Sequence, residues 1–171
     1  VVLRVVNNWI KLSWRYIKIK SKIKQKTTYF WPLIESDLNS SIVGSNSIQN
    51  LLNFELFRSA IQALPSQKKA FYLQENQGWE SCLIYAWREF MQGQLIGVPH
   101  TTIRYWDLRY FFDKRLFKKT HFSRNLQPDL IAVNGKDVQN KLINGGYSAA
   151  KLFSVEALRY LFLDDYSKTN Y

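Results

Sequence analysis

The stretch from Phe71 to Phe112 constrains the fold of this chain more than any other part. It opens with a short apolar run over residues 70–73, and the polar residues 74–77 end that run. A helical pattern follows from Gly78 to Met91, with apolar residues three or four positions apart. A second apolar run then covers residues 95–98. A strand, a helix and a second strand in this order predict two neighbouring parallel strands.

Polar residues follow each of the two predicted strands. Glu75 and Asn76 come after the first, and Pro99 and His100 come after the second. Because the carboxyl ends of parallel strands open onto the ligand crevice, we expect Glu75 and His100 at the same edge of the sheet. Both are candidate catalytic residues.

Each of these two residues also has a structural interpretation. Glu75 could act as a general base or hold a sugar hydroxyl, but an acid here could equally cap the helix that starts near Gly78. His100 could bind a phosphate or transfer a proton near neutral pH, or it could be a buried, hydrogen-bonded histidine. The residues alone leave both questions open.

Later segments continue the alternation of strands and helices. Residues 128–135 predict a loop, a short buried strand and a turn, and the next helix covers Lys136–Asn144 before two glycines. Another strand is expected over Lys151–Val155, followed by a short helix or connection. This order predicts an α/β fold, Rossmann-like, with a parallel sheet and helices on both of its faces. The strands are few for a complete doubly wound domain, so we expect a piece of something larger.

The N-terminal arm carries most of the charge. Residues 1–30 contain eight Lys or Arg and no acid, so the other 141 residues hold only +3 of the net charge of +11. Apolar residues of the arm approximate a helical stripe up to Ile17. A surface helix on anionic lipid, a nucleic-acid-binding segment and a plain connecting helix all fit this pattern, with nucleic acid the least favoured.

The segment from Thr27 to Asn46 contains many Ser and Asn residues and predicts an exposed loop. Ser47 is the expected N-cap of a helix that Pro65 ends and that packs on the sheet. We therefore divide the chain into a basic arm and loop (1–46), an α/β domain (47–163) and a polar tail (164–171).

The loop after the second predicted strand is rich in aromatic and charged residues. Arginines form forked contacts with phosphate or carboxylate, so Arg104 and Arg109 are candidates for substrate binding. Both could instead pair internally with Asp107. Core positions are expected for Trp79, Trp87 and Trp106, although Trp106 is the best candidate of the three for stacking against a sugar.

Several kinds of chemistry have no signal in this sequence. It contains no P-loop, no GxGxxG, no GxSxG and no Cys/His spacing typical of a metal site. One cysteine and two histidines make a structural zinc site unexpected, and we expect no cofactor. No apolar run approaches the roughly 18–20 residues of a membrane span.

Four separated segments resemble a family of surface-carbohydrate biosynthesis proteins, which are encoded with O-antigen and capsule genes and are similar to two-domain GT-B glycosyltransferases. They are YLQENQGWE (72–80), LIGVPHTTIRYWDLRYF (95–111), PDLIAVNG (128–135) and GGYSAAKLFSVEALRYLFL (145–163). The resemblance implies transfer of a sugar from a nucleotide-activated donor to a glycan or lipid-linked acceptor. It also implies a location on the cytoplasmic side of the membrane and catalysis without a metal.

The resemblance also implies roles for particular residues. Glu75 would be the base or contact the acceptor, with Asn76 and Glu80 in support. His100, Thr101 and Arg104 would face an interdomain cleft towards phosphate. The chain would then be the N-terminal, acceptor-side half, without the donor domain, and inactive alone. The alternative function is a non-catalytic module that the basic arm tethers to membrane or nucleic acid. A transferase should depend on Glu75 and His100, whereas a tethered module should depend on the lysines of the arm and on salt.

Overall fold

The computed structural model describes residues 1–99, 103–104, 107–111 and 127–155. The chain divides into two compact units, Val1–Pro65 and Ser66–Tyr171.

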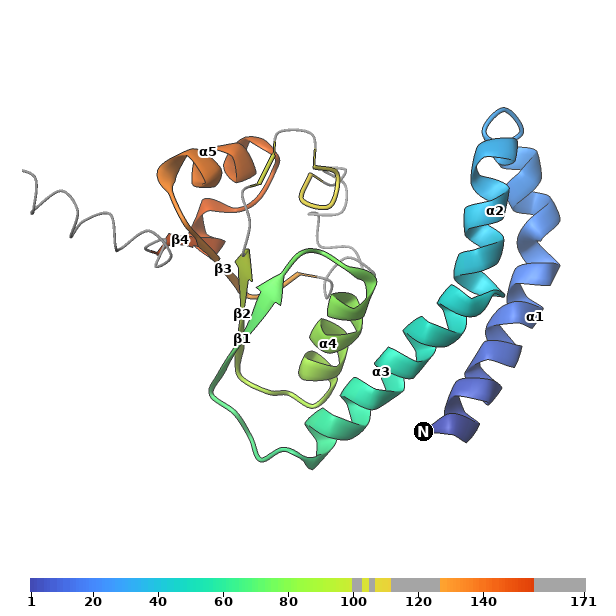
Figure 1. Ribbon diagram of the computed structural model, residues 1–171, viewed down its shortest axis with the longest axis horizontal. Coiled ribbons are helices and arrows are strands. Elements are labelled where there is room, and N and C mark those ends of the chain that lie inside the picture. Colours follow the sequence, from blue (N-terminus) through green and yellow to red (C-terminus); the bar gives the residue numbers. More distant parts are fainter. Residues whose placement is uncertain (100–102, 105–106, 112–126, 156–171) are drawn as a thin grey trace, which may run out of the picture. The chain divides into compact units, whose positions relative to one another are not determined.

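The first unit consists of three helices: α1 (Val2–Lys26), α2 (Trp31–Ile42) and α3 (Ser45–Ala63) (Figure 1). Helix α1 covers most of the N-terminal segment in which the lysines and arginines gather. The predicted loop over Thr27–Asn46 is wrong, because α2 occupies most of it. Its first turn contains a proline, Pro32, which suits a helix start, and Trp31 is buried. No helix in the described part of the chain combines the length and apolarity needed to cross a bilayer.

Helix α3 begins two residues before the predicted N-cap. Gly44 precedes the helix in an extended conformation, and Ser47 is a buried residue inside it. The helix ends at Ala63, and Leu64 is extended, as expected for a residue before proline. Helix α3 belongs to the helical unit with α1 and α2, so the two units divide after Pro65, whereas the sequence placed the division after Asn46.

Polar contacts fix α1 against the other two helices. Glu55 of α3 is fully buried and pairs with Arg4 at 3.0 Å, and its other oxygen accepts a hydrogen bond from Asn8 at 3.2 Å. Trp9 donates its indole N–H to the carbonyl of Val43 at 2.9 Å. These contacts join segments more than 30 residues apart in the sequence.

The second unit contains a four-stranded sheet in the order β1-β2-β3-β4, with every neighbouring pair parallel. The strands are β1 (Lys69–Gln74), β2 (Gln94–Pro99), β3 (Leu130–Val133) and β4 (Leu152–Ser154). Helix α4 (Gly78–Glu89) connects the first two strands, and α5 (Lys136–Asn144) with the short 3-10 helix η3 (Ala149–Lys151) connects the last two. The predicted α/β class and parallel sheet are confirmed, and α5 has the predicted bounds.

The described helices of this unit pack on one face of the sheet. Paired residues of parallel strands point to the same side, so Tyr72, Gly97 and Ile131 share a face. Tyr72 contacts Trp79 of α4, and Ile131 packs with Leu142 of α5. Among the described residues of the unit, no helix is seen on the opposite face, so the expectation of helices on both faces is not met there.

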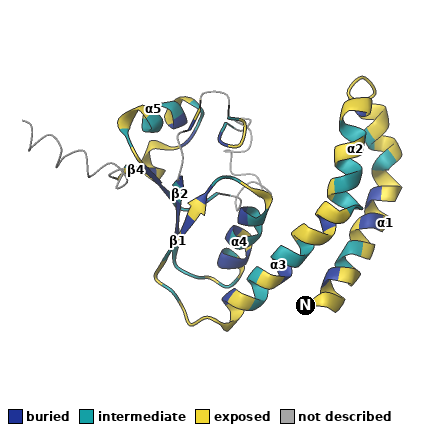
Figure 2. Cartoon of the chain, viewed as in Figure 1, coloured by how far each residue is buried: buried dark blue, intermediate teal, exposed yellow. Residues whose placement is uncertain are grey.

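That opposite face is partly open at β1. Phe71 and Leu73 alternate with the inward residues of the strand and are 67% and 60% exposed. Figure 2 shows the resulting exposed colour on the arrow of β1. The cluster of buried residues that includes Ile131, Val133 and Leu142 therefore lies on the face covered by α5, while Ile96 and Ala132 are buried on the other face.

Candidate functional site

The candidate site lies where β1 ends and α4 begins. Glu75 directly follows β1, and it is partly exposed. Strand β2 runs beside β1 in the same direction, with Gln74 opposite Pro99, so both strands end at the same edge. The predicted arrangement of the two strand ends is confirmed.

Glu80 fixes the backbone on which Glu75 is carried. The carboxylate of Glu80 is 2% exposed, and one of its oxygens accepts hydrogen bonds from the backbone N–H groups of Glu75 (2.8 Å) and Gln77 (2.9 Å). Glu80 and Gln77 together form the capping box of α4. The helix is thus capped by Gln77 and Glu80, and Glu75 is not part of this capping box.

Asn76 shapes the turn between Glu75 and the helix. Its φ is 55°, in the left-handed region where Asn is tolerated better than most residues. The carbonyl oxygen of its side chain accepts a 3.1 Å hydrogen bond from the side-chain amide of Gln74. The backbone on both sides of Glu75 is therefore held by side chains of the same short segment.

Gln74 is a buried polar residue that the sequence analysis did not single out. Its side chain lies over Gly97 of β2, where an added Cβ would come within 2.4 Å of the Gln74 amide oxygen. Only glycine leaves this space free. A polar residue at an inward position of a strand, next to a strand with a central glycine, is the signal that could have identified it.

Two tyrosine hydroxyl groups form hydrogen bonds that connect distant segments to the end of β1. Tyr110 donates its hydroxyl to the backbone carbonyl of Gln74 at 2.6 Å, and Tyr147 donates its hydroxyl to the carbonyl of Tyr110 at 2.7 Å. Burial, with the negative charge of Glu80 as the next cause, raises the pKa of Tyr110 to about 12. The same two causes raise the pKa of Tyr72.

Four buried polar atoms around this turn have hydrogen-bonding capacity that no described residue fills. They belong to residues at the end of β1 and the start of α4: the hydroxyl of Tyr72, Oε1 of Gln74, Nδ2 of Asn76 and Oε2 of Glu80. Buried polar atoms are nearly always paired, and unpaired ones mark a place for a water or a ligand group. Two of these atoms can accept a hydrogen bond, one can donate, and the tyrosine hydroxyl can both donate and accept. This combination suits a ligand with hydroxyl groups.

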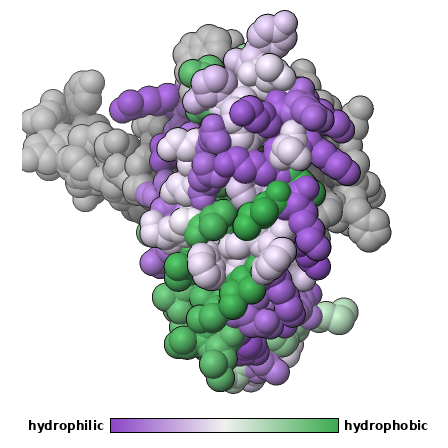
Figure 3. Space-filling model, turned by 90° about the vertical axis from the view of Figure 1, so that its right-hand side faces the viewer, coloured by the Kyte–Doolittle hydropathy of each residue, from purple (hydrophilic) through white to green (hydrophobic). Residues whose placement is uncertain are grey.

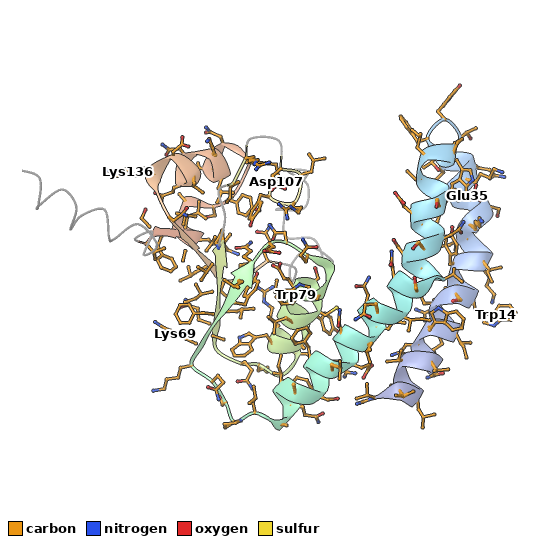
Figure 4. All side chains as sticks on the ribbon, in the orientation of Figure 1. Trp14, Glu35, Lys69, Trp79, Asp107 and Lys136 are labelled. Carbon is orange, nitrogen blue, oxygen red and sulfur yellow. The ribbon has the colours of Figure 1, made fainter. Side chains whose placement is uncertain are left out.

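The charged loop after β2 contains an internal ion pair. Arg109 contacts Asp107 through Nε (2.9 Å) and Nη2 (2.7 Å), and Figure 4 marks Asp107 on this loop. The hydrogen bonds from Arg109 lower the pKa of Asp107. The alternative interpretation, an internal ion pair with Asp107, is confirmed for Arg109. Arg104 is exposed, and its carbonyl accepts the N–H of Asp107 at 3.1 Å.

The remaining predicted residues have mixed outcomes. His100, Thr101 and Trp106 lie outside the described residues, so their roles stay predictions. Trp87 is buried, as expected, and donates to the carbonyl of Gly93 at 2.6 Å. Trp79, marked in Figure 4, is partly exposed and meets Tyr72 edge-on, with ring centroids 6.5 Å apart.

Comparison of the chain with protein families, curated proteins and solved structures finds no match. Among the described residues, no three His, Cys, Asp or Glu side chains gather as metal ligands. What the edge of the sheet offers is one partly exposed carboxylate on a fixed backbone, next to buried polar atoms with unfilled hydrogen-bonding capacity.

Proposed function

We propose that the α/β unit is the acceptor-side part of a glycosyltransferase of GT-B type. It would take part in cell-surface polysaccharide biosynthesis and transfer a sugar from a nucleotide-activated donor. Its substrates would be the nucleotide sugar and a glycan or lipid-linked acceptor. Glu75 would act as the general base that removes the proton of the attacking acceptor hydroxyl.

The observation that carries this proposal is the way in which Glu75 is held. Its backbone N–H is bound by the buried carboxylate of Glu80, and the next residue is locked in a left-handed conformation by its own side-chain contact. A base must be placed within hydrogen-bonding reach of the proton it removes, and a fixed backbone limits where its carboxylate can lie. The position at the carboxyl end of a parallel strand is where such sheets bind ligands.

The polar atoms next to Glu75 suit a sugar substrate. Sugars present many hydroxyl groups, each of which both donates and accepts. Asn76 Nδ2 can donate to such a hydroxyl, and Glu80 Oε2 can accept from one. Both atoms are buried in the turn that carries Glu75.

The test is a transfer assay with radiolabelled nucleotide sugars and lipid-linked saccharide acceptors. The 171-residue chain and its Glu75→Gln variant would be compared, with and without any further domain that the gene encodes. Loss of the base should reduce transfer by about 100-fold to 10,000-fold. The stability of the variant, measured by denaturant unfolding, should stay within about 0.5 kcal/mol of the parent.

The matched control is Glu89→Gln, which makes the same change on an exposed position of α4. It should leave transfer unchanged. Transfer by Glu75→Gln at the parent rate would remove the assignment of Glu75 as the base. If the chain together with any further domain that the gene encodes neither binds nor transfers a sugar from any nucleotide sugar in a broad panel, the glycosyltransferase proposal itself fails.

A further inference from the structure

Helix α1 presents two different surfaces in addition to the side that packs in the helical unit. Its buried residues, Val5, Ser13 and Tyr16, face that packing. Successive residues turn about 100° around a helix axis, so residues three or four apart form a row. An apolar row and a basic row both run along the exposed part of α1.

The apolar row is unusually exposed for a folded unit. It consists of large hydrophobic residues at spacings of three and four: Leu3, Val6, Ile10, Trp14 and Ile17. Leu3 is 86% exposed, Ile17 64% and Trp14 62%. Figure 3, which faces this side of the molecule, shows hydrophobic residues gathered over its lower part beside hydrophilic surface. A contiguous exposed apolar row marks an interaction surface.

The basic row lies beside the apolar one, about a quarter turn around the helix. It consists of four exposed residues: Lys11, Arg15, Lys18 and Lys22. None of the four has an ion-pair partner among the described residues. The ammonium of Lys18 lies 5.9 Å from the centre of the Trp14 ring, which links the two rows. Arg4 is not part of this row, because Glu55 holds it.

We propose that this face of α1 docks on the surface of an anionic lipid bilayer. The helix would lie in the plane of the interface, with the apolar row in the boundary between headgroups and acyl chains. The basic row would then contact the anionic headgroups. Trp14 suits this depth because its ring is apolar at one end and polar at the other. Lysine and arginine stems can cover apolar surface while their charges stay in the headgroup layer.

The combination of rows favours lipid over nucleic acid. Phosphates of nucleic acid would be bound by the basic row, but they give the aliphatic side chains of Leu3, Ile10 and Ile17 nothing to bury against. A bilayer uses both rows at once. The proposal concerns the helical unit and does not depend on the function of the α/β unit.

The test is flotation of the whole chain with vesicles of phosphatidylcholine, alone or mixed with phosphatidylserine. The chain should float with the anionic vesicles, and binding should fall as salt is raised. Lys18→Gln combined with Lys22→Gln should weaken binding about thirtyfold, taking about 1 kcal/mol for each basic residue near an anionic surface. Lys136→Gln with Lys151→Gln, exposed positions of the α/β unit, makes the same charge change and should leave binding unchanged.

The apolar row is tested by Ile10→Ser with Ile17→Ser, which should weaken binding about tenfold or more. Its control is Leu33→Ser, at an exposed position of α2. Circular dichroism of each variant shows whether the helices remain. Brominated lipid should quench part of the tryptophan emission, and Trp14→Phe should remove that part.

Several results would overturn the proposal. They are equal binding to neutral and anionic vesicles, binding that the α1 variants leave unchanged, and preferential binding of RNA that depends only on the lysines. None of them bears on sugar transfer by Glu75, so the two proposals fail separately.

Discussion

The hydroxyl of Tyr110 donates a 2.6 Å hydrogen bond to the backbone carbonyl of Gln74, 36 residues earlier in the chain. The bond ends at the last residue of β1, immediately before Glu75. Tyr147 in turn donates to the carbonyl of Tyr110, so three distant segments meet beneath the candidate site. The position of Glu75 therefore depends on residues that do not touch it.

Replacement of Tyr110 by Phe should destabilise the α/β unit. The ring would still fill its place in the core, but the buried carbonyl of Gln74 would lose this donor. We expect a loss of about 1–3 kcal/mol in the free energy of unfolding. Urea unfolding followed by circular dichroism measures it, and Tyr29→Phe, at an exposed position, is the control. An unchanged unfolding midpoint for Tyr110→Phe would show that water replaces the hydroxyl without cost.

The buried tyrosines should also make the unit sensitive to alkali. The ordinary pKa of Tyr is 10.0, and that of Tyr110 is raised to about 12, chiefly by burial. The folded state then favours the protonated phenol, so this contribution to stability is complete below pH 10. It is lost as the pH rises through 12. Burial also raises the pKa of Tyr72 and of Tyr147, which adds to the loss in the same direction.

Unfolding at a fixed urea concentration, measured from pH 8 to pH 12, checks the alkaline prediction. Stability should fall most steeply above pH 10, together with the rise of tyrosinate absorbance. The Tyr110→Phe variant should show a shallower fall than the parent. A fall of the same steepness in both proteins would mean that Tyr110 does not contribute.

The sequence predicts the sheet unit well, because its signals are local. Short apolar runs, a helical period between them and the glycines after residue 144 are properties of neighbouring residues, and they identify the four strands, α4 and α5. Helix α2 was missed because it contains Ser36, Asn39, Ser40 and Ser41, which local rules assign to loops. Trp31 at the start of α2 is buried. Its packing is a tertiary contact, and local sequence rules do not take tertiary contacts into account.

The candidate site was only half predictable for the same reason. Glu75 could be identified from its place after a strand. The role of Gln74 depends on its contact with Gly97, 23 residues later in the chain. The role of Tyr110 depends on its hydrogen bond to the Gln74 carbonyl, 36 residues earlier. Glu80 was expected to support Glu75, but its burial and the hydrogen bond that it accepts from the N–H of Glu75 arise only in the folded turn.

Removal of Glu80 should loosen this turn. Glu80→Ala deletes the acceptor of two backbone N–H groups, one of them that of Glu75. Hydrogen bonds to charged groups contribute about 1.5–3 kcal/mol, so we expect a loss of that order for Glu80→Ala and a smaller one for Glu80→Gln, which keeps one oxygen. Denaturant unfolding measures both. Glu89→Gln on the same helix is the control, and a Glu80→Ala protein as stable as the parent would contradict the role given to Glu80.

The ion pair in the helical unit should show strong coupling between its partners. Glu55 is fully buried, whereas the Arg4 side chain that pairs with it at 3.0 Å is 53% exposed. Removal of one partner of a fully buried pair costs about 3–5 kcal/mol. Because half of Arg4 is in water, we expect a smaller loss of about 1–3 kcal/mol for Arg4→Met, which leaves the buried carboxylate with Asn8 and Arg58.

The double variant Arg4→Met, Glu55→Met should recover much of that loss, because it removes the buried Glu55 carboxylate together with the Arg4 guanidinium that pairs with it. A double-mutant cycle by urea unfolding measures the coupling, and losses that simply add would mean that the two residues stabilise α1 and α3 independently.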